Sequence, residues 1–368
     1  MSPHDSPCRR SAGLAPIGAA TLVAILAVAP AGAQDNVEIL MYKGADRQQK
    51  LVEGAKKEGQ LFFYSAMIAN QALRPIAEAF MKKYPFVKVS YWRGDSEDIL
   101  TKVLAEAKAN NVVGDVVEGT GVGELAVQAK VVDRYFTPEI SAYPEKYRDK
   151  DGQWTPTRLS YFGIAYNTNL VPAHQVPNSY EDLLKPEYKG KMAWRIGSSS
   201  GAPLFITNLW NAWGNEKAMA YLQKLKDQRI INFGSGSART LVDRVVAGEY
   251  AIALQIFAHH PLISKAKGAP VDAKIFSPVA TTAATMVIPK GIKHPHAALL
   301  LVDFLLSKDG QRILERADYI PAHPAVETSP NIAAIVPRLA NLQENFISPE
   351  TLIRLTESSE KIYQDLFR

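Results

Sequence analysis

Apolar and polar positions alternate with two different periods along residues 45–130. Aromatic and β-branched residues gather in three short runs, which predict strands at 60–65, 87–92 and 115–117. Between these runs apolar residues recur every three or four positions, which predicts helices at 45–58, 71–84 and 124–130, and one more that Ser96 caps. Strands and helices that alternate over short connections indicate a parallel sheet with helices on both faces, which is an α/β fold.

A strand predicted at 158–169 divides this alternation into two parts. It contains aromatic and β-branched residues and ends in an Asn-Thr-Asn turn signal, and the α/β alternation then starts again. A second isolated strand is predicted at 283–289, just before a final helical run. Two such crossings between two α/β units have the geometry of a hinge, and hinged lobes close around ligands. The predicted division is 34–160 plus 283–320 for the first lobe, 168–282 for the second lobe, and 161–167 and 283–289 for the hinge strands.

The C-terminal part of the chain is predicted to be helical. Residues 297–306 are apolar on nearly every face, which predicts a buried helix, and residues 309–316 continue it with a short apolar face. Further helices are predicted at 332–342 and 349–367. We expect the segment 321–368 to brace the lobes from outside and to carry no chemistry.

The chain length and the net charge limit the classes of protein to which this sequence can belong. The chain has 368 residues, which exceeds what one hydrophobic core usually supports, so about two domains are expected. Its formal net charge is +5, and Lys and Arg are interleaved with Asp and Glu. A nucleic-acid partner is therefore not expected, because such proteins cluster their basic residues.

The N-terminus has the pattern of an export signal. Two arginines precede an uncharged apolar stretch that ends in the small-x-small triplet at residues 31–33. This predicts a signal peptide over residues 1–33, cleavage near Ala33-Gln34 and a periplasmic location. The stretch is short and rich in Ala and Gly, so an uncleaved anchor is the less favoured alternative, while Sec and twin-arginine export both stay open. The only cysteine, Cys8, lies before the stretch, so the mature chain is expected to have no thiol.

Several segments, in this order, resemble one family. LFFYSA, AEAFMKKYPFVKVSYWRG and SEDILTKVLAEAKANNVVGDVVEG are similar to the first lobe of bacterial extracellular solute-binding proteins of ABC importers. GIAYNTNLVP, PNSYEDLLKPEYKGKMAW, VAGEYAIAL and MVIPKGIKHPHAALLLVDFLLSKDGQRIL continue the likeness. Behind a signal peptide, they resemble the branch of ferric-iron, phosphonate, thiamine and polyamine receptors. The resemblance implies a two-lobed type II periplasmic-binding-protein fold, a small-molecule ligand and no catalytic step. It also implies a monomer without a cofactor that serves an inner-membrane permease and its ATPase.

Candidate ligand residues follow from the predicted strands. Ligands of open parallel sheets bind beyond the carboxyl ends of the strands, beside helix N-termini. The residues expected there are Ser65, Arg93, Glu118, Thr120, Tyr161, Arg195, Ser198, Ser199, Ser200, Ser237, Arg239, Gln255 and His259.

Two Ser/Gly loops, 197–201 and 234–239, directly precede helical patterns in the second lobe. Backbone N–H groups at such a helix start favour an anion, and arginines can grip a carboxylate or phosphonate with two hydrogen bonds. We therefore expect a small organic anion or phosphonate-like ligand. The alternative is that Ser199 and Ser237 are plain N-caps and that the arginines lie on solvated faces.

Metal binding is a second possibility. The paired tyrosines of the iron receptors would fall on Ala258 and His259, so both phenolates are missing. His259 could still bind a metal together with Tyr161 or Glu118, but Fe(III) prefers anionic oxygen donors to imidazole. Ferric iron or a ferric chelate is therefore the second choice of ligand.

A serine hydrolase is a more distant possibility. Residues 197–201 fit G-x-S-x-G with Ser199 as the nucleophile, and five histidines follow it in the chain. No HGGG-type oxyanion loop precedes the motif, and the motif lies after the crossover, in the second lobe. A single-sheet hydrolase does not have that arrangement, so a binding protein is favoured.

Overall fold

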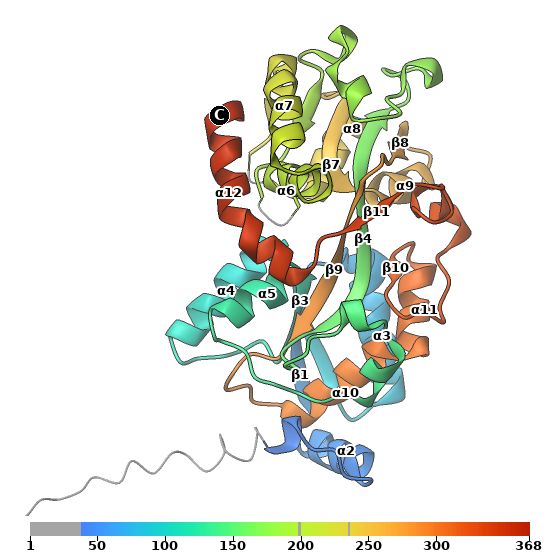
Figure 1. Cartoon of the computed structure of the whole chain (residues 1–368). Coiled ribbons are helices and arrows are strands. Elements are labelled where there is room, and N and C mark those ends of the chain that lie inside the picture. Colours follow the sequence, from blue (N-terminus) through green and yellow to red (C-terminus); the bar gives the residue numbers. More distant parts are fainter. Residues whose placement is uncertain (1–37, 198–199, 235) are drawn as a thin grey trace, which may run out of the picture.

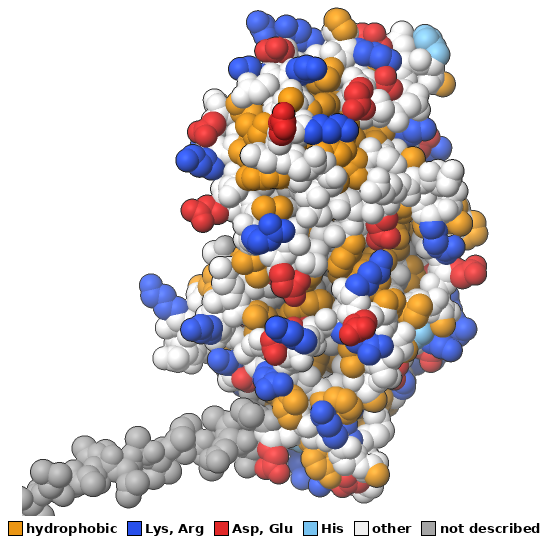
Figure 2. All heavy atoms as spheres, in the orientation of Figure 1, with side chains coloured by type: hydrophobic (Ala, Val, Ile, Leu, Met, Phe, Trp, Pro, Cys, Tyr) orange, Lys and Arg blue, Asp and Glu red, His pale blue; other side chains and the backbone are white. Residues whose placement is uncertain are grey.

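The computed structural model describes residues 38–197, 200–234 and 236–368. The predicted signal peptide, residues 1–33, lies outside the described residues, and so do Ser198 and Ser199. Within the described ranges, no helix combines the length and the apolar character that crossing a membrane requires. Figure 2 shows basic and acidic side chains interspersed over the visible face, without a large patch of one sign.

The N-terminal third forms the alternating pattern that the sequence predicts. Its elements are α2 (Arg47–Glu58), β1 (Gln60–Ser65), α3 (Arg74–Lys83), β2 (Lys88–Arg93), α4 (Ser96–Lys108), β3 (Val116–Thr120) and α5 (Val122–Gln128). A π-helical turn, Ala69–Leu73, precedes α3. The strands β2, β1 and β3 lie side by side and parallel, so their carboxyl ends share one edge.

The middle of the chain repeats the pattern. Its elements are β4 (Thr155–Asn167), β5 (Met192–Trp194), α6 (Ala202–Trp213), α7 (Asn215–Leu225), β6 (Ile231–Asn232), α8 (Ala238–Val246), β7 (Ile252–Phe257), α9 (His259–Lys265) and β8 (Val271–Lys274). In this part β5 is parallel to both β6 and β7. We call the part built around β1, β2 and β3 the first lobe, and the part built around β5, β6 and β7 the second lobe.

One long strand, β4, belongs to the sheets of both lobes (Figure 1). Its first half, up to Tyr161, pairs with β9 (Val279–Val287), and its second half pairs with β7 and β8. The strand order is β2-β1-β3-β9-β4-β7-β5-β6. Each lobe has its own large hydrophobic cluster, with Phe63 and Leu300 in one and Trp194 and Leu254 in the other. The predicted α/β architecture of two lobes that share crossover strands is confirmed, while the residue limits of the lobes and hinge stay a prediction.

The C-terminal part returns to the first lobe and then spans the outside of both. Its elements are α10 (Pro295–Leu306), α11 (Lys308–Arg316), β10 (Ile320–Pro321), β11 (Glu344–Phe346) and α12 (Pro349–Phe367). The helix α10 packs against α2 and is buried along almost its whole length. The last helix, α12, packs mainly on α6 of the second lobe and also contacts α5 of the first (Figure 1).

One predicted helix is wrong. The segment 332–342 contains only a 3-10 helix, Pro330–Ile335, and the chain then turns and adds β11 parallel to β9. The cause is Pro337, because a residue before proline is driven out of the helical region, and Val336 accordingly has φ −90° and ψ 113°.

The start of α4 also differs from the prediction. Ser96 is the first helical residue, and the N-cap position belongs to Asp95. The side chain of Asp95 makes no capping hydrogen bond, although aspartate is among the best capping residues. Its carboxylate pairs with the guanidinium group of Arg93 instead.

Candidate functional site

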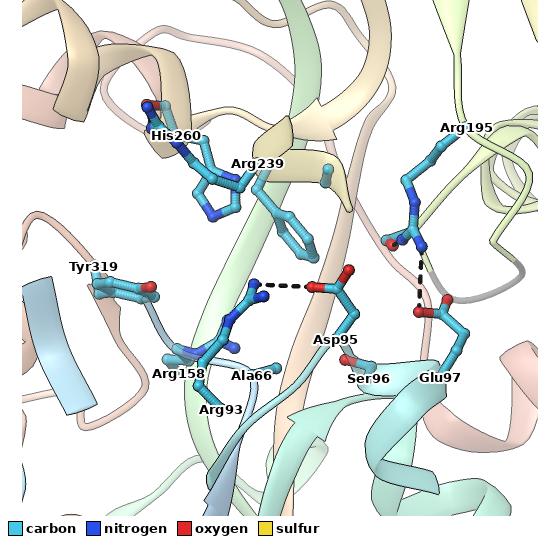
Figure 3. Close-up of a pocket in the computed structure, with 13 residues that line it drawn as sticks. Ala66, Arg93, Asp95, Ser96, Glu97, Arg158, Arg195, Arg239, His260 and Tyr319 are labelled. Atoms are coloured by element: carbon cyan, nitrogen blue, oxygen red, sulfur yellow. Dashed lines mark hydrogen bonds and ion pairs between the residues drawn. The ribbon is translucent and has the colours of Figure 1, made fainter. Parts of the chain in front are cut away.

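A pocket lies where the two lobes face each other, beyond the carboxyl ends of β1 and β2 and the C-terminal end of β5 (Figure 3). The free space inside it is about 20 Å³, room for about one water molecule, so a larger ligand requires the lobes to sit farther apart. The residues that line it are Ala66, Arg93, Asp95, Ser96, Glu97, Arg158, Arg195, Ser200, Ala238, Arg239, Phe257, His260 and Tyr319.

Four arginines from four different elements line this pocket. In the first lobe, Arg93 ends β2 and Arg158 lies in β4. In the second lobe, Arg195 follows β5 and Arg239 lies in the first turn of α8. A guanidinium group stays protonated throughout the pH range of proteins, so the pocket presents positive charge from both lobes.

Arg158 is held from behind by a buried carboxylate. Its Nε lies 3.2 Å from Oε1 of Glu118, whose side chain is fully buried. Glu118 also accepts hydrogen bonds from Ser65 Oγ at 2.7 Å and from Thr157 Oγ1 at 3.1 Å. Neither Ser65 nor Glu118 lines the pocket, but together they hold Arg158, which does.

Arg195 is as buried as Arg158 and connects the two lobes. Its Nε donates to the carbonyl oxygen of Gly236 at 3.0 Å, and its guanidinium also donates to Ser200 Oγ. Its Nη2 lies 3.3 Å from Oε2 of Glu97, which is in the first turn of α4 (Figure 3). The ion pair joins an element of the second lobe to an element of the first.

Arg239 is fixed within the second lobe. Its Nη2 donates to Ser264 Oγ and to Asp243 Oδ1, both at 2.6 Å, and its Nη1 donates to the carbonyl oxygen of His260 at 3.1 Å. Asp243 does not line the pocket, whereas the guanidinium that it pairs with does.

Arg93 pairs with the carboxylate of Asp95, whose Oδ1 lies 2.8 Å from Arg93 Nη2. Loss of solvent raises the pKa of Asp95, and the nearby Arg93 and Arg195 oppose that rise. In Figure 3 the Asp95 carboxylate lies between the guanidinium groups of Arg93 and Arg195. Two carboxylates, those of Asp95 and Glu97, thus share the pocket with the four arginines.

Two adjacent histidines lie at the second-lobe side of the pocket. His260 lines it, is 7% exposed, and has no hydrogen-bond partner for Nδ1 among the described residues. His259 is completely buried behind it, with its ring centroid 4.7 Å from that of Tyr319. Burial, with help from neighbouring positive charges, lowers the pKa of His259 to about 3 and that of His260 well below its usual range. Both imidazoles are neutral at pH 7, so each ring donates a hydrogen bond from one nitrogen and accepts one at the other.

The buried His259 should make the protein less stable in acid. Its pKa is about 3 when folded and 6.5 in the reference state, so below pH 6.5 the unfolded chain binds more protons and stability falls as pH falls. At pH 5 this costs about 2 kcal/mol relative to pH 7 or above. We expect His259→Phe to reduce the stability difference between pH 7 and pH 5, as measured by chemical unfolding at each pH. The exposed His174 supplies the control, since His174→Phe should leave that difference unchanged. An unchanged pH dependence in His259→Phe would contradict the account.

The predicted site residues fall into three groups. Those that line the pocket are Arg93, Arg195, Ser200 and Arg239. Those that lie directly behind lining residues are Ser65, Glu118 and His259. Those that the structure places away from the pocket lining are Thr120, Tyr161, Ser237 and Gln255. Ser198 and Ser199 lie outside the described residues.

Two of the residues outside the lining have evident structural roles. Ser237 is the N-cap of α8 and accepts a hydrogen bond from the backbone N–H of Thr240, as the N-cap interpretation of this serine expects. Tyr161 packs in the hydrophobic cluster of the first lobe, and burial raises the pKa of its phenol.

Six polar or charged lining residues were missed by reasoning from the sequence, namely Asp95, Ser96, Glu97, Arg158, His260 and Tyr319. Asp95 carried a usable signal, because it comes two residues after the end of β2. Arg158 carried a weaker one, as a charged residue inside a run that otherwise predicts a buried strand.

The geometry gives less support to metal binding and to serine hydrolysis than to anion binding. Across the described residues, no group of three His, Cys, Asp or Glu side chains is placed to hold a metal ion. Of the histidines that a hydrolase could use, His294 and His296 are paired with Asp115 and Glu58 at the N-terminus of α10.

Comparison with known proteins gives a consistent pattern. A family model described as bacterial extracellular solute-binding protein matches residues 113–341. An uncharacterized protein of Haemophilus influenzae is 27% identical over 272 residues, which are 70% of this chain and 76% of that protein. The Fe(3+)-binding periplasmic protein of Serratia marcescens is 23% identical over 238 residues, which are 62% of this chain and 68% of that protein.

Solved structures show the same fold. The periplasmic binding protein AfuA from Actinobacillus pleuropneumoniae, with fructose-6-phosphate bound, has a TM-score of 0.72 at 24% identity, covering 84% of this chain and 99% of that one. Iron-bound HitA from Pseudomonas aeruginosa has a TM-score of 0.69 at 20% identity, covering 83% of this chain and 99% of that one.

Proposed function

Because this chain belongs to the family of bacterial extracellular solute-binding proteins, we propose that it captures a small organic anion with a phosphate or phosphonate head group. The chain is the substrate-binding component of an ABC importer, and such proteins deliver a small solute to a membrane permease. The proposal concerns the chemistry of that solute and the residues that bind it.

The observation that carries the proposal is the convergence of four guanidinium groups on one pocket from both lobes. With the carboxylates of Asp95 and Glu97 counted against them, the lining side chains sum to a charge of +2 (four arginines minus two carboxylates). Behind the lining, Glu118 and Asp243 pair with Arg158 and Arg239, so the support comes from the placement of the guanidinium groups rather than from a large net charge. A phosphate monoester carries about −2 at pH 7 and presents three acceptor oxygens. Arginine binds such oxygens in pairs, so the hydrogen-bonding pattern of the pocket matches.

Two further features of the pocket favour an anion. The 13-residue helix α4 begins at the pocket with Ser96, and the N-terminus of a helix carries partial positive charge. Independently, the Nδ1 of the buried His260 has no partner within the described part of the chain, and in the tautomer with the proton on Nδ1 it can donate to an anion. A polar atom buried without a partner is costly unless a ligand satisfies it.

A ligand held by both pairs of arginines would stabilise the closed arrangement of the lobes. A ligand shifts a conformational equilibrium only by binding one state more tightly, and contacts with both lobes exist only when they are closed. We propose that β4 and the segment entering β9 carry the hinge motion, and that the permease recognises the closed form. The export signal predicted at residues 1–33 would place the protein in the periplasm, where it would act as a monomer, with no catalytic step, for a permease driven by its ATPase.

The relatives leave two candidate ligand classes. AfuA has fructose-6-phosphate bound, which supports a phosphorylated ligand, whereas HitA and the Serratia marcescens protein bind iron. Here Ala258 and His259 stand where the iron receptors are expected to have paired tyrosines, and both are buried. These features favour the phosphorylated anion.

Ferric ion should therefore bind poorly. We expect titration with ferric citrate to produce no strong visible absorption band, because such a band in tyrosine-bound iron arises from charge transfer and requires phenolate ligands. Methylphosphonate, titrated in parallel by calorimetry, should release or absorb measurable heat and saturate. A coloured complex of one iron per chain, together with no response to methylphosphonate, would make iron the ligand and overturn the proposal.

A further inference from the structure

Asp95 occupies a helix N-cap without acting as a cap. Its backbone has the extended conformation of an N-cap residue, with φ −75° and ψ 160°, yet its side chain accepts no hydrogen bond from the first turn of α4. The carboxylate instead pairs with Arg93 Nη2 at 2.8 Å and lines the pocket. Since capping by aspartate stabilises a helix, an aspartate at this position that turns its carboxylate into the binding pocket suggests a role in binding.

The surroundings of Asp95 are dominated by charged groups. Arg93 comes from β2, Arg195 from the loop after β5, and Glu97 and Asp98 from α4. The remaining arginines of the pocket, Arg158 and Arg239, and the neutral His260 complete the lining. An anion bound to Arg93 would lie next to the carboxylate that Arg93 already holds.

This placement brings two anionic groups together on one arginine, and a shared proton would relieve their repulsion. An ionised carboxylate only accepts hydrogen bonds, and so does a fully ionised oxyanion. Two such groups on one arginine repel each other and leave their facing oxygens without a donor. A single proton between them converts the repulsion into a short, charge-assisted hydrogen bond.

We propose that Asp95 is the specificity-determining residue of the pocket and accepts a hydrogen bond from a P–OH group of the ligand's head. This inference rests on the proposed function. The pocket should then accept phosphate and phosphonate head groups, which keep a removable proton near neutral pH, and should reject sulfate and sulfonate head groups, which have none. Loss of solvent raises the pKa of Asp95 and so makes it easier for the pair to retain a proton.

The test compares two probes of matched shape on three proteins. Methylphosphonate and methanesulfonate are titrated by calorimetry at pH 7 into the full-length mature protein, Asp95→Asn and Asp243→Asn. The wild type should bind the phosphonate about 10- to 150-fold more tightly, the range expected for one hydrogen bond to a charged group. In Asp95→Asn the amide N–H can donate to either head, so the preference should fall to within about threefold. Asp243→Asn is the matched control, because Asp243 also pairs with a pocket arginine but does not line the pocket, and it should keep the wild-type preference.

A second readout separates selection by a proton from simple support of Arg93. Calorimetry at pH 8 in two buffers of different ionisation enthalpy counts the protons taken up with methylphosphonate. The wild type should take up a fraction of a proton, and Asp95→Asn should take up less. Equal binding of the two probes by the wild type, or an unchanged preference in Asp95→Asn, would overturn this inference and leave the anion site in place. Failure of the wild type to bind either probe at millimolar concentration would overturn both the inference and the proposed function.

Discussion

Replacing Arg195 with methionine should weaken the binding of methylphosphonate by roughly 30- to 5,000-fold. The side chain of Arg195 is 4% exposed, and its guanidinium is fixed by Gly236 and Ser200 before any ligand arrives. Its removal leaves a desolvated ligand charge without its partner, which costs roughly 2–5 kcal/mol. Methionine keeps most of the side chain's length and apolar stem, so the loss should come from the charge. The measurement is titration calorimetry on wild type and variant.

Arg244 provides the matched control for that experiment. It lies in the same lobe and pairs with Glu249, but both side chains are about half exposed and lie outside the pocket lining. Arg244→Met should leave the affinity within about twofold, because exposed ion pairs contribute little. An affinity of Arg195→Met within about threefold of the wild type would place the ligand elsewhere in the cleft.

Replacing Glu118 with alanine should lower the free energy of unfolding by about 3–5 kcal/mol. Glu118 is fully buried against Arg158, so its loss leaves a buried positive charge that no other side chain neutralises. The double variant Glu118→Ala/Arg158→Met should regain part of the loss, because it removes both charges. Thermal unfolding by calorimetry measures both effects.

Glu249, whose carboxylate is exposed, provides the control for the Glu118→Ala experiment. Glu249→Ala breaks an ion pair with Arg244 at the surface and should cost about 0–1 kcal/mol. A loss of that small size in Glu118→Ala would show that Arg158 does not depend on its buried partner. No recovery in the double variant would show that the damage comes from the lost packing rather than from the unpaired charge.

Much of the fold could be predicted because local patterns and tertiary packing agree. The limits of β1 and α12 match the prediction to the residue, and glycine, proline and a capping serine mark where they begin. The short strands β10 and β11 could not be predicted, because only pairing with β4 and β9 makes them strands. The strand β9 begins at Val279 instead of residue 283 for the same reason.

The site was predictable to the extent that binding residues follow strands. Arg93 is the last residue of β2, and Arg195 directly follows β5. The rule that binding residues follow strands therefore finds both. The rule fails inside β4, because successive side chains of a strand point to opposite faces of the sheet. Arg158 and Tyr161 are an odd number of residues apart, so Arg158 reaches the pocket while Tyr161 packs in the core. Which face would meet the other lobe depends on the assembled structure.

The central claim is that the pocket between the lobes holds a phosphorylated or phosphonate anion. Mass spectrometry of the small molecule released by denaturing natively purified, undialysed mature protein tests it most directly, with phosphorus quantified in the same sample. The account predicts one phosphorus-containing molecule of low mass per chain, absent from Arg195→Met purified in the same way. Stoichiometric iron, or a ligand without phosphorus that persists in Arg195→Met, would contradict it.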